Sequence, residues 1–254
     1  MNKFTRNILP PLIPFIVITA AAELVVRTGW MPDWLIPAPS QVLQSISKDG
    51  RELTQASTTT ALASLIGFGI SASVGMIIAV VLASGGWVQR AFYPYAVFFQ
   101  TVPIIAIAPL LVIWFGFNMS AVVASSFIVS VFPVIANTLA GLLSTEPALK
   151  DMFSLYGAGS AATLFKLRLP FALPSIFTGL RIAAGLSVIG TIVGEFITGS
   201  GLGGLIQVAR QQQRVDKVFA VLLLSSILGI VLFGGINLIS KLSLRHWHAS
   251  EGER

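Results

Sequence analysis

Six long apolar stretches constrain this sequence more than any other feature. A bilayer core about 30 Å thick requires about 20 apolar residues in a helix. Hydrophobic residues make up 55% of the chain and charged residues only 10%, whereas roughly a quarter of the residues in a soluble domain are charged. The sequence therefore predicts an all-α membrane protein in which 1–254 forms a single transmembrane domain with about six spans. The expected spans are 8–26, 60–83, 92–115, 121–143, 176–198 and 218–240.

The distribution of positive charge predicts the orientation of these spans. An even number of spans places both termini on one side of the membrane. If that side is the cytoplasm, ten of the 16 Lys and Arg residues lie inside and six outside, which the positive-inside rule favours. No basic run indicates nucleic-acid binding. The tryptophans fall at or just beyond the span ends, as in an aromatic belt: Trp30, Trp34, Trp87, Trp114 and Trp247.

Several kinds of chemistry are excluded by what the sequence lacks. There is no cysteine, and the two histidines lie together near the C-terminus, so neither a metal site nor a cofactor site is expected in this chain. No GxxxxGK[ST] loop is present, so the chain is not expected to hydrolyse ATP itself. Gly199, Gly201 and Gly204 match a dinucleotide fingerprint, but they follow an apolar span and not a strand, so they indicate a turn at the membrane surface.

The segment 144–175, on the expected cytoplasmic side, is too long for a simple turn between spans. Ser144 or Thr145 is a plausible N-cap for a short helix over 147–156, with Pro147 in its first turn. A bend over 157–159 should follow. A second short helix over 161–168 should stop before Pro170, because the residue before a proline avoids the α region. The alternative is an amphipathic pair of helices lying on the membrane surface, with Lys166 and Arg168 near lipid phosphates.

Polar residues within the spans are few, and they are candidates for a translocation path. The third stretch contains three prolines, which should break or kink it and free backbone carbonyls. Glu195 is the best candidate for a functional charge, although it could be solvated at the interface or pair with Arg210. The others could instead satisfy hydrogen bonds between helices. The candidate path residues are Gln100, Thr101, Pro103, Asn137, Thr138 and Glu195.

Small residues recur at fourfold spacing in two of the spans. One ridge runs from Gly67 to Ala83 and the other from Gly190 to Thr198. Small residues allow two helices to approach closely. We expect both ridges to serve packing within the chain, with a dimer face as the alternative.

Four stretches of the sequence resemble a known family. Gly157 followed by LPFALPSIFTGLR (169–181) resembles the EAA loop, the permease signature of bacterial ATP-binding-cassette (ABC) importers. IPAPSQVL (36–43), TVPIIAIAPLLVIWFG (101–116) and GEFITGSGLGGLI (194–206) are similar to the branch that includes nitrate, sulfonate, taurine, pyrimidine-precursor and riboflavin permeases. The chain departs from the family where Glu-Ala-Ala is usual. Asp151, Met152 and Phe153 stand there, which implies an altered groove on the partner ATPase.

The resemblance implies a fold, partners and roles for particular residues. The fold is that of a type I importer permease in a bacterial inner membrane, with the 144–175 segment as a cytoplasmic coupling loop. The implied partners are two ABC ATPase subunits that bind ATP and Mg, a periplasmic or lipid-anchored binding protein, and a second copy of the permease. The implied ATPase-coupling residues are Asp151, Met152, Phe153, Leu155, Tyr156, Gly157 and Ala158.

The transported solute is not fixed by these motifs. The wording QTVPIIAIAPL (100–110) favours a pyrimidine precursor or a riboflavin-like heterocycle over sulfonate, taurine or nitrate. A secondary transporter or channel is the alternative function, and it would usually show ion-coupling acids or unwound half-helices near the midplane. An intramembrane enzyme is disfavoured, because the acids within the spans, Glu23 and Glu195, are single and near the outer ends.

Overall fold

The computed structural model describes residues 3–244, and within them it contains helices and no strand. The predicted all-α fold is therefore confirmed. Trp247 and the two histidines lie outside the described residues. The helices are α1 (Lys3–Arg27), α2 (Pro39–Lys48), α3 (Gly50–Leu82), α4 (Gly86–Thr101), α5 (Ile104–Phe115), α6 (Met119–Leu143), α7 (Pro147–Leu155), α8 (Ser160–Thr163), α9 (Leu169–Thr198), α10 (Gly201–Gln211) and α11 (Val215–Leu244), with a π-helical turn, Leu164–Arg168, between α8 and α9.

Four helical segments of the described chain are long and apolar enough to cross a membrane. They are α3, α6, α11 and the continuous helix Ser160–Thr198, which joins α8, the π turn and α9. Helix α1 contains the first expected span, 8–26. The third expected span, 92–115, is broken, as its three prolines predict, because it consists of α4 and α5, which are bent by 96°. The chain is thus a multi-pass membrane protein.

Proline chemistry explains the bend between α4 and α5. Val102 is extended, with φ −74° and ψ 122°, and Pro103 is the N-cap of α5. A residue before proline is forced out of the α region, so α4 ends at Thr101. Pro94 and Pro109 lie inside α4 and α5, and both helices continue through them.

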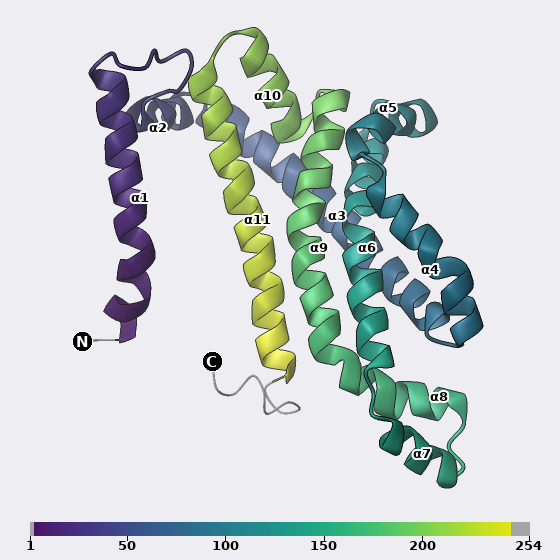
Figure 1. Cartoon of the computed structure of the whole chain (residues 1–254). Coiled ribbons are helices and arrows are strands. Elements are labelled where there is room, and N and C mark those ends of the chain that lie inside the picture. The colour runs from purple at the N-terminus through teal and green to yellow at the C-terminus, as the bar shows by residue number, and fades with distance from the viewer. Residues whose placement is uncertain (1–2, 245–254) are drawn as a thin grey trace.

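Helix α6 packs against both α3 and α9, and α9 lies between α11 and α6 (Figure 1). A Cβ on Gly75 of α3 would lie 2.8 Å from the Cβ of Val134, and one on Gly190 of α9 would lie 2.8 Å from the carbonyl oxygen of Ser125. Both small-residue ridges therefore pack against α6 within the chain, as expected. Polar pairs such as the Ser71 and Ser130 hydroxyls, 2.7 Å apart, join the same helices.

The two ends of the bundle carry different elements (Figure 1). Helices α2 and α10 lie at one end, whereas α7 and α8 lie at the other, together with the start of α1 and the end of α11. Helix α1 stands at the edge and packs against α2. Trp87 and Trp114, in the first turn of α4 and the last turn of α5, are exposed. Trp30 and Trp34, which follow α1, are exposed as well.

Candidate functional site

Helix α7 begins without the predicted side-chain cap. Its N-cap is Glu146, which makes no side-chain capping hydrogen bond, and Pro147 occupies the first helical position. The Ser144 hydroxyl donates to the carbonyl oxygen of Gly141 at 2.9 Å, and Thr145 bonds back to Leu142. The prediction that Ser144 or Thr145 caps α7 is therefore wrong, because both hydroxyls bond to the end of α6 instead.

Helix α7 ends in the glycine bend that the sequence predicts. Gly157 has φ +68°, a left-handed conformation that L side chains avoid. Its N–H donates to the carbonyl oxygen of Ser154 at 2.9 Å, and the N–H of Ala158 donates to that of Phe153 at 2.9 Å. This is the Schellman pattern, which satisfies carbonyl groups left unpaired at a helix end. The bend turns the chain back toward α8.

The end of α7 presents an apolar surface to the surroundings. Leu155 is 88% exposed and Tyr156 86%, and Met152 is exposed too. We call these three residues the loop tip. Asp151 is also exposed. Phe153 is half-buried, so less of its side chain is exposed than the sequence suggested. No residue of α7 is buried.

The return from the loop differs from the sequence expectation. Leu169, before Pro170, has helical angles, φ −66° and ψ −48°, so the second short helix does not stop there. The π turn explains the exception. Its closing bond runs from the N–H of Leu169 to the carbonyl oxygen of Leu164, five residues back. The wider turn changes which backbone groups pair and accommodates a residue without an N–H, so α8 continues into α9.

Arg168, in the same π turn, points inward. Its Nε donates to the carbonyl oxygen of Leu142 at 3.1 Å, and its Nη1 donates to that of Ala83 at 3.2 Å. The guanidinium is half-buried between α6 and α3. This side chain is therefore hydrogen-bonded to other helices of the chain, whereas Lys166 is exposed.

Three of the candidate path residues meet at the bend between α4 and α5. Gln100, Thr101 and Pro103 line a pocket of about 310 Å³, which we call the bend pocket. Its other walls come from α4, α5, α6 and α9: Phe99, Val102, Ile104, Ile128, Val129, Pro133 and Leu186.

Of the two candidates on α6, one is hydrogen-bonded within the helix and the other is buried. The amide of Asn137 donates to the carbonyl oxygen of Pro133 at 2.9 Å, one turn from the bend pocket. Thr138 is fully buried, and its hydroxyl has no partner among the described residues. Neither side chain lines the bend pocket.

Glu195 lies apart from the bend pocket and is fully buried. Its carboxylate accepts hydrogen bonds from the hydroxyl of Thr60 at 2.8 Å and from the N–H of Gly203 at 3.0 Å. The N–H of Leu202 in turn donates to Thr60 at 3.0 Å. Glu195 therefore joins α3, α9 and α10, and the expected alternatives of solvation or pairing with Arg210 are wrong. It lines a smaller pocket of about 100 Å³.

The glycines after α9 shape the chain around this carboxylate. Gly199 and Gly201 have φ +76° and +53°. A Cβ on Gly203 would lie 2.7 Å from the Cβ of Glu195. The glycine pattern therefore serves a tight turn into α10, as expected, and no strand precedes it.

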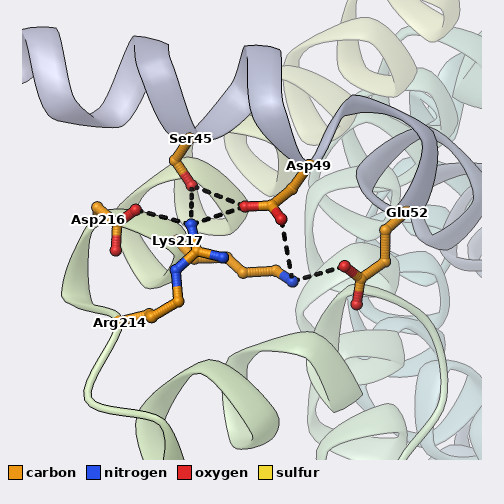
Figure 2. A network of polar contacts seen from close by, with 6 residues as sticks. All are labelled: Ser45, Asp49, Glu52, Arg214, Asp216 and Lys217. Atoms are coloured by element: carbon orange, nitrogen blue, oxygen red, sulfur yellow. Dashed lines mark hydrogen bonds and ion pairs between the residues drawn. The ribbon is translucent and has the colours of Figure 1, made fainter.

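An ion cluster that the sequence analysis missed lies at the α2 and α10 end (Figure 2). The Arg214 guanidinium contacts Asp49 at 2.7 Å and Asp216 at 2.9 Å. The ammonium of Lys217, only 4% exposed, lies 2.6 Å from Glu52 and 3.9 Å from Asp49. The cluster connects the end of α2, the start of α3 and the turn before α11.

The charges of the ion cluster stabilise each other. The hydrogen bond from Arg214 is the largest cause that lowers the pKa of Asp49. Asp49 and Asp216 raise the pKa of Arg214 above its usual value.

Comparison with known proteins assigns the chain to a family. Residues 71–244 match the family described as "Binding-protein-dependent transport system inner membrane component". The chain belongs to this family of ABC importer permeases. A probable ABC transporter permease protein of Haemophilus influenzae is 33% identical to this permease. The match covers 91% of this permease and 95% of the relative.

Two other relatives are named for different solutes. The formylaminopyrimidine transport permease protein ThiX of Halalkalibacterium halodurans is 34% identical over 95% of this permease and 97% of the relative. The putative aliphatic sulfonates transport permease protein SsuC of Escherichia coli is 30% identical over 96% and 94%. The family match includes the loop tip, the bend pocket and Glu195, whereas α1 and α2 precede it.

Proposed function

We propose that this permease imports a small solute that an extracytoplasmic binding protein delivers, by alternating access driven by a separate ABC ATPase. The observation that carries the proposal is the loop tip, an apolar surface at the end of a short helix in which no residue is buried. Family membership supplies the kind of partner. ATP and Mg belong to that partner, and the permease itself contributes no catalytic group.

The loop tip has the chemistry of a docking anchor. Leucine, tyrosine and methionine side chains at the end of a rigid helix fit a pocket on a partner surface, and exposed apolar groups of this kind mark interaction sites. The Schellman end at Gly157 fixes their direction. Asp151 is shorter than the glutamate usual in the family, and Phe153 is larger than the usual alanine. We therefore expect a correspondingly wider groove on the ATPase.

The bend pocket is the proposed part of the translocation path. The 96° break between α4 and α5 frees backbone groups that a cavity can satisfy. Gln100 and Thr101 are exposed there, and a second copy of the permease facing them would enclose the path. Because Glu195 is bonded within the chain, we assign it to holding α10 and not to binding the solute.

The lining of the bend pocket favours a neutral heterocycle as the solute. Phe99 offers an aromatic face and Gln100 an amide, which suit stacking and hydrogen bonding to a pyrimidine. The described residues that line this pocket include no Lys or Arg, which a sulfonate would favour. A pyrimidine precursor is therefore the proposed solute, with a riboflavin-like heterocycle next and sulfonate, taurine or nitrate after it.

The broken α4–α5 pair also occurs in secondary transporters, where unwound helices bind coupling ions. The two functions differ in their energy source. Uptake by proteoliposomes that contain the permease, the ATPase and the binding protein should require internal ATP and should survive ionophores that collapse ion gradients. Uptake driven by an ion gradient without ATP would support the secondary-transporter alternative and contradict the proposal.

The docking role of the loop tip is tested by substitution. Leu155→Asp should abolish co-purification of the ATPase and ATP-dependent uptake, because a carboxylate replaces the apolar anchor. Leu155→Met, which keeps the side chain apolar, is the matched control and should retain both. Since Leu155 is exposed, neither change affects the packing of the bundle. ATPase binding by the Leu155→Asp variant at the wild-type level would refute this docking site.

A further inference from the structure

Arg168 hydrogen-bonds the return segment of the coupling loop to two other membrane helices. Its guanidinium donates to the carbonyl oxygens of Leu142, in the last turn of α6, and Ala83, at the end of α3. Because the π turn continues into α9, three spans meet at this residue. We propose that Arg168 transmits movement of the loop to α3 and α6.

The chemistry of the contact explains why an arginine serves here. The last carbonyls of a helix have no partner within the helix, and they form the negative end of its dipole. A guanidinium carries a permanent charge and several donors in a fixed plane, so it can bond to two carbonyls in different directions. In the described part of the chain no carboxylate pairs with Arg168, so its charge is compensated by these two helix ends.

Apolar contacts seat the same turn against the bundle. Leu164 and Leu169, on either side of Arg168, pack against the buried cluster that includes Leu82 and Leu142. Helix α7, by contrast, has no buried residue. The loop thus has a free end for a partner and a fixed end on α3 and α6, which is the arrangement that a lever requires.

This inference rests on the proposed function, and it predicts a distinct defect. If the loop still docks but the guanidinium is missing, the ATPase can move the loop while α3 and α6 lag behind. ATP hydrolysis would continue and solute movement would fall. A residue that merely stabilised the fold would lower both together, through the amount of assembled complex.

The first experiment measures the ratio of solute imported to ATP hydrolysed in proteoliposomes with the full complex. Arg168→Gln should lower this ratio at least about fivefold, the lower end of typical coupling free energies, while the ATPase still co-purifies. The ratio for Arg168→Lys should lie between those of the wild type and Arg168→Gln, because an ammonium keeps the charge without the planar fork of a guanidinium. Lys166→Gln removes an exposed charge in the same turn, and this control should keep the wild-type ratio.

The second experiment follows the contact itself. The chain has no cysteine, so spin labels can be placed at Ser84→Cys, after α3, and Ala161→Cys, on α8, both exposed. The labelled permease is assembled with the ATPase, and the distance between labels is measured with and without ATP. With Arg168 in place the two labels should move together and keep one distance. In the Arg168→Gln background the distance should shift or broaden when ATP binds.

The outcomes separate this inference from the proposed function. If the wild-type permease binds no ATPase, the proposed function fails whatever Arg168 does. If the complex assembles and Arg168→Gln keeps both the wild-type ratio and the wild-type label distance, the role of Arg168 is refuted and the docking proposal stands. Should Arg168→Gln not assemble, the Arg168→Lys variant decides, since a wild-type ratio and label distance there would overturn the inference.

Discussion

At the scale of single residues, Gly157 is held in a conformation that few other residues adopt. An L side chain in the left-handed region costs roughly 1–2 kcal/mol, and asparagine tolerates it better than alanine. We expect Gly157→Ala to speed hydrogen exchange of the α7 amides about five- to thirtyfold in the full-length permease, because 1.4 kcal/mol is about a factor of ten. Gly157→Asn should stay closer to the wild type.

Gly159 provides the matched control for this prediction. It has φ −67°, and nothing lies within 4 Å of a Cβ built on it. Gly159→Ala should therefore leave the exchange rates of α7 unchanged. Gly157→Pro should be the most severe change, since proline is fixed near φ −65°. Equal exchange rates in all these variants would show that the left-handed turn does not hold α7.

Asp49 of the ion cluster leads to a prediction on pH. Its folded-state pKa lies below the ordinary 3.8. Its contribution to stability is therefore complete above pH 3.8 and is lost as pH falls through the lower folded value. Asp49→Asn should lower the Tm of the solubilised permease at pH 7 by about 2–4 °C, the shift that 1 kcal/mol gives in a chain of this size.

The pH profile distinguishes this role from a general effect of charge. The difference in Tm between the wild type and Asp49→Asn should narrow below pH 3.8, because the wild-type carboxylate becomes protonated there. Asp33→Asn changes an acid outside the ion cluster and should not produce this pH dependence. A Tm difference that is constant from pH 7 to pH 3 would contradict the assigned ion pairs.

At the scale of elements, the helices can be predicted from the sequence, but whether a given proline breaks a helix cannot always be predicted. Pro103 breaks the chain as predicted, because Val102 adopts the extended conformation. Pro170 does not, because Leu164 and Leu169 pack against the core and a π turn absorbs the missing N–H. The choice between the two outcomes depends on tertiary packing, which a rule based on neighbouring residues does not contain. Glu195 could be identified along the sequence, but its hydrogen bond with Thr60 could not, since Thr60 comes from a distant helix.

Helix α10 offers a test of close packing. A Cβ on Gly203 would lie 2.7 Å from the Cβ of Glu195 and from the backbone nitrogen of Phe196. Backbone cannot yield cheaply, and overpacking costs about 1–3 kcal/mol. Gly203→Ala should therefore lower the Tm and loosen α10, measured as faster hydrogen exchange over 201–211.

A matched substitution lies on α11. Nothing lies within 4 Å of a Cβ built on Gly229, and alanine is favoured over glycine inside a helix by about 1 kcal/mol. Gly229→Ala should therefore hold or raise the Tm. If the two variants change the Tm in the same direction and by the same amount, close packing of α10 on α9 is not what the glycine provides.

At the scale of the whole molecule, the all-helical membrane fold and the packing ridges were predictable but the ion cluster was not. Apolar length and small-residue spacing are local patterns, so they can be identified along the chain. Ser45 and Arg214 are 169 positions apart, and only the topology of the helices brings them together. The same holds for Arg168, whose two partners lie at the ends of other helices.

The arrangement of the whole chain predicts which surfaces face each side of the membrane. Helix α9 has 30 residues, a length of about 45 Å at 1.5 Å per residue, which exceeds the bilayer core of about 30 Å. Helices α7 and α10 lie at opposite ends of the bundle (Figure 1). The excess of basic residues expected at the α7 end predicts that this end faces the cytoplasm.

Labelling of single cysteines tests this orientation, since the native chain has none. A membrane-impermeant maleimide should label Gln212→Cys, exposed after α10, in cells whose outer envelope has been opened. Ser154→Cys, exposed on α7, should react only after the inner membrane is permeabilised. Reaction of both from the same side would contradict a bundle that crosses the membrane between α7 and α10. Reversed accessibility would place the loop tip outside, where no ATP-driven partner could reach it, and would refute the docking proposal as well.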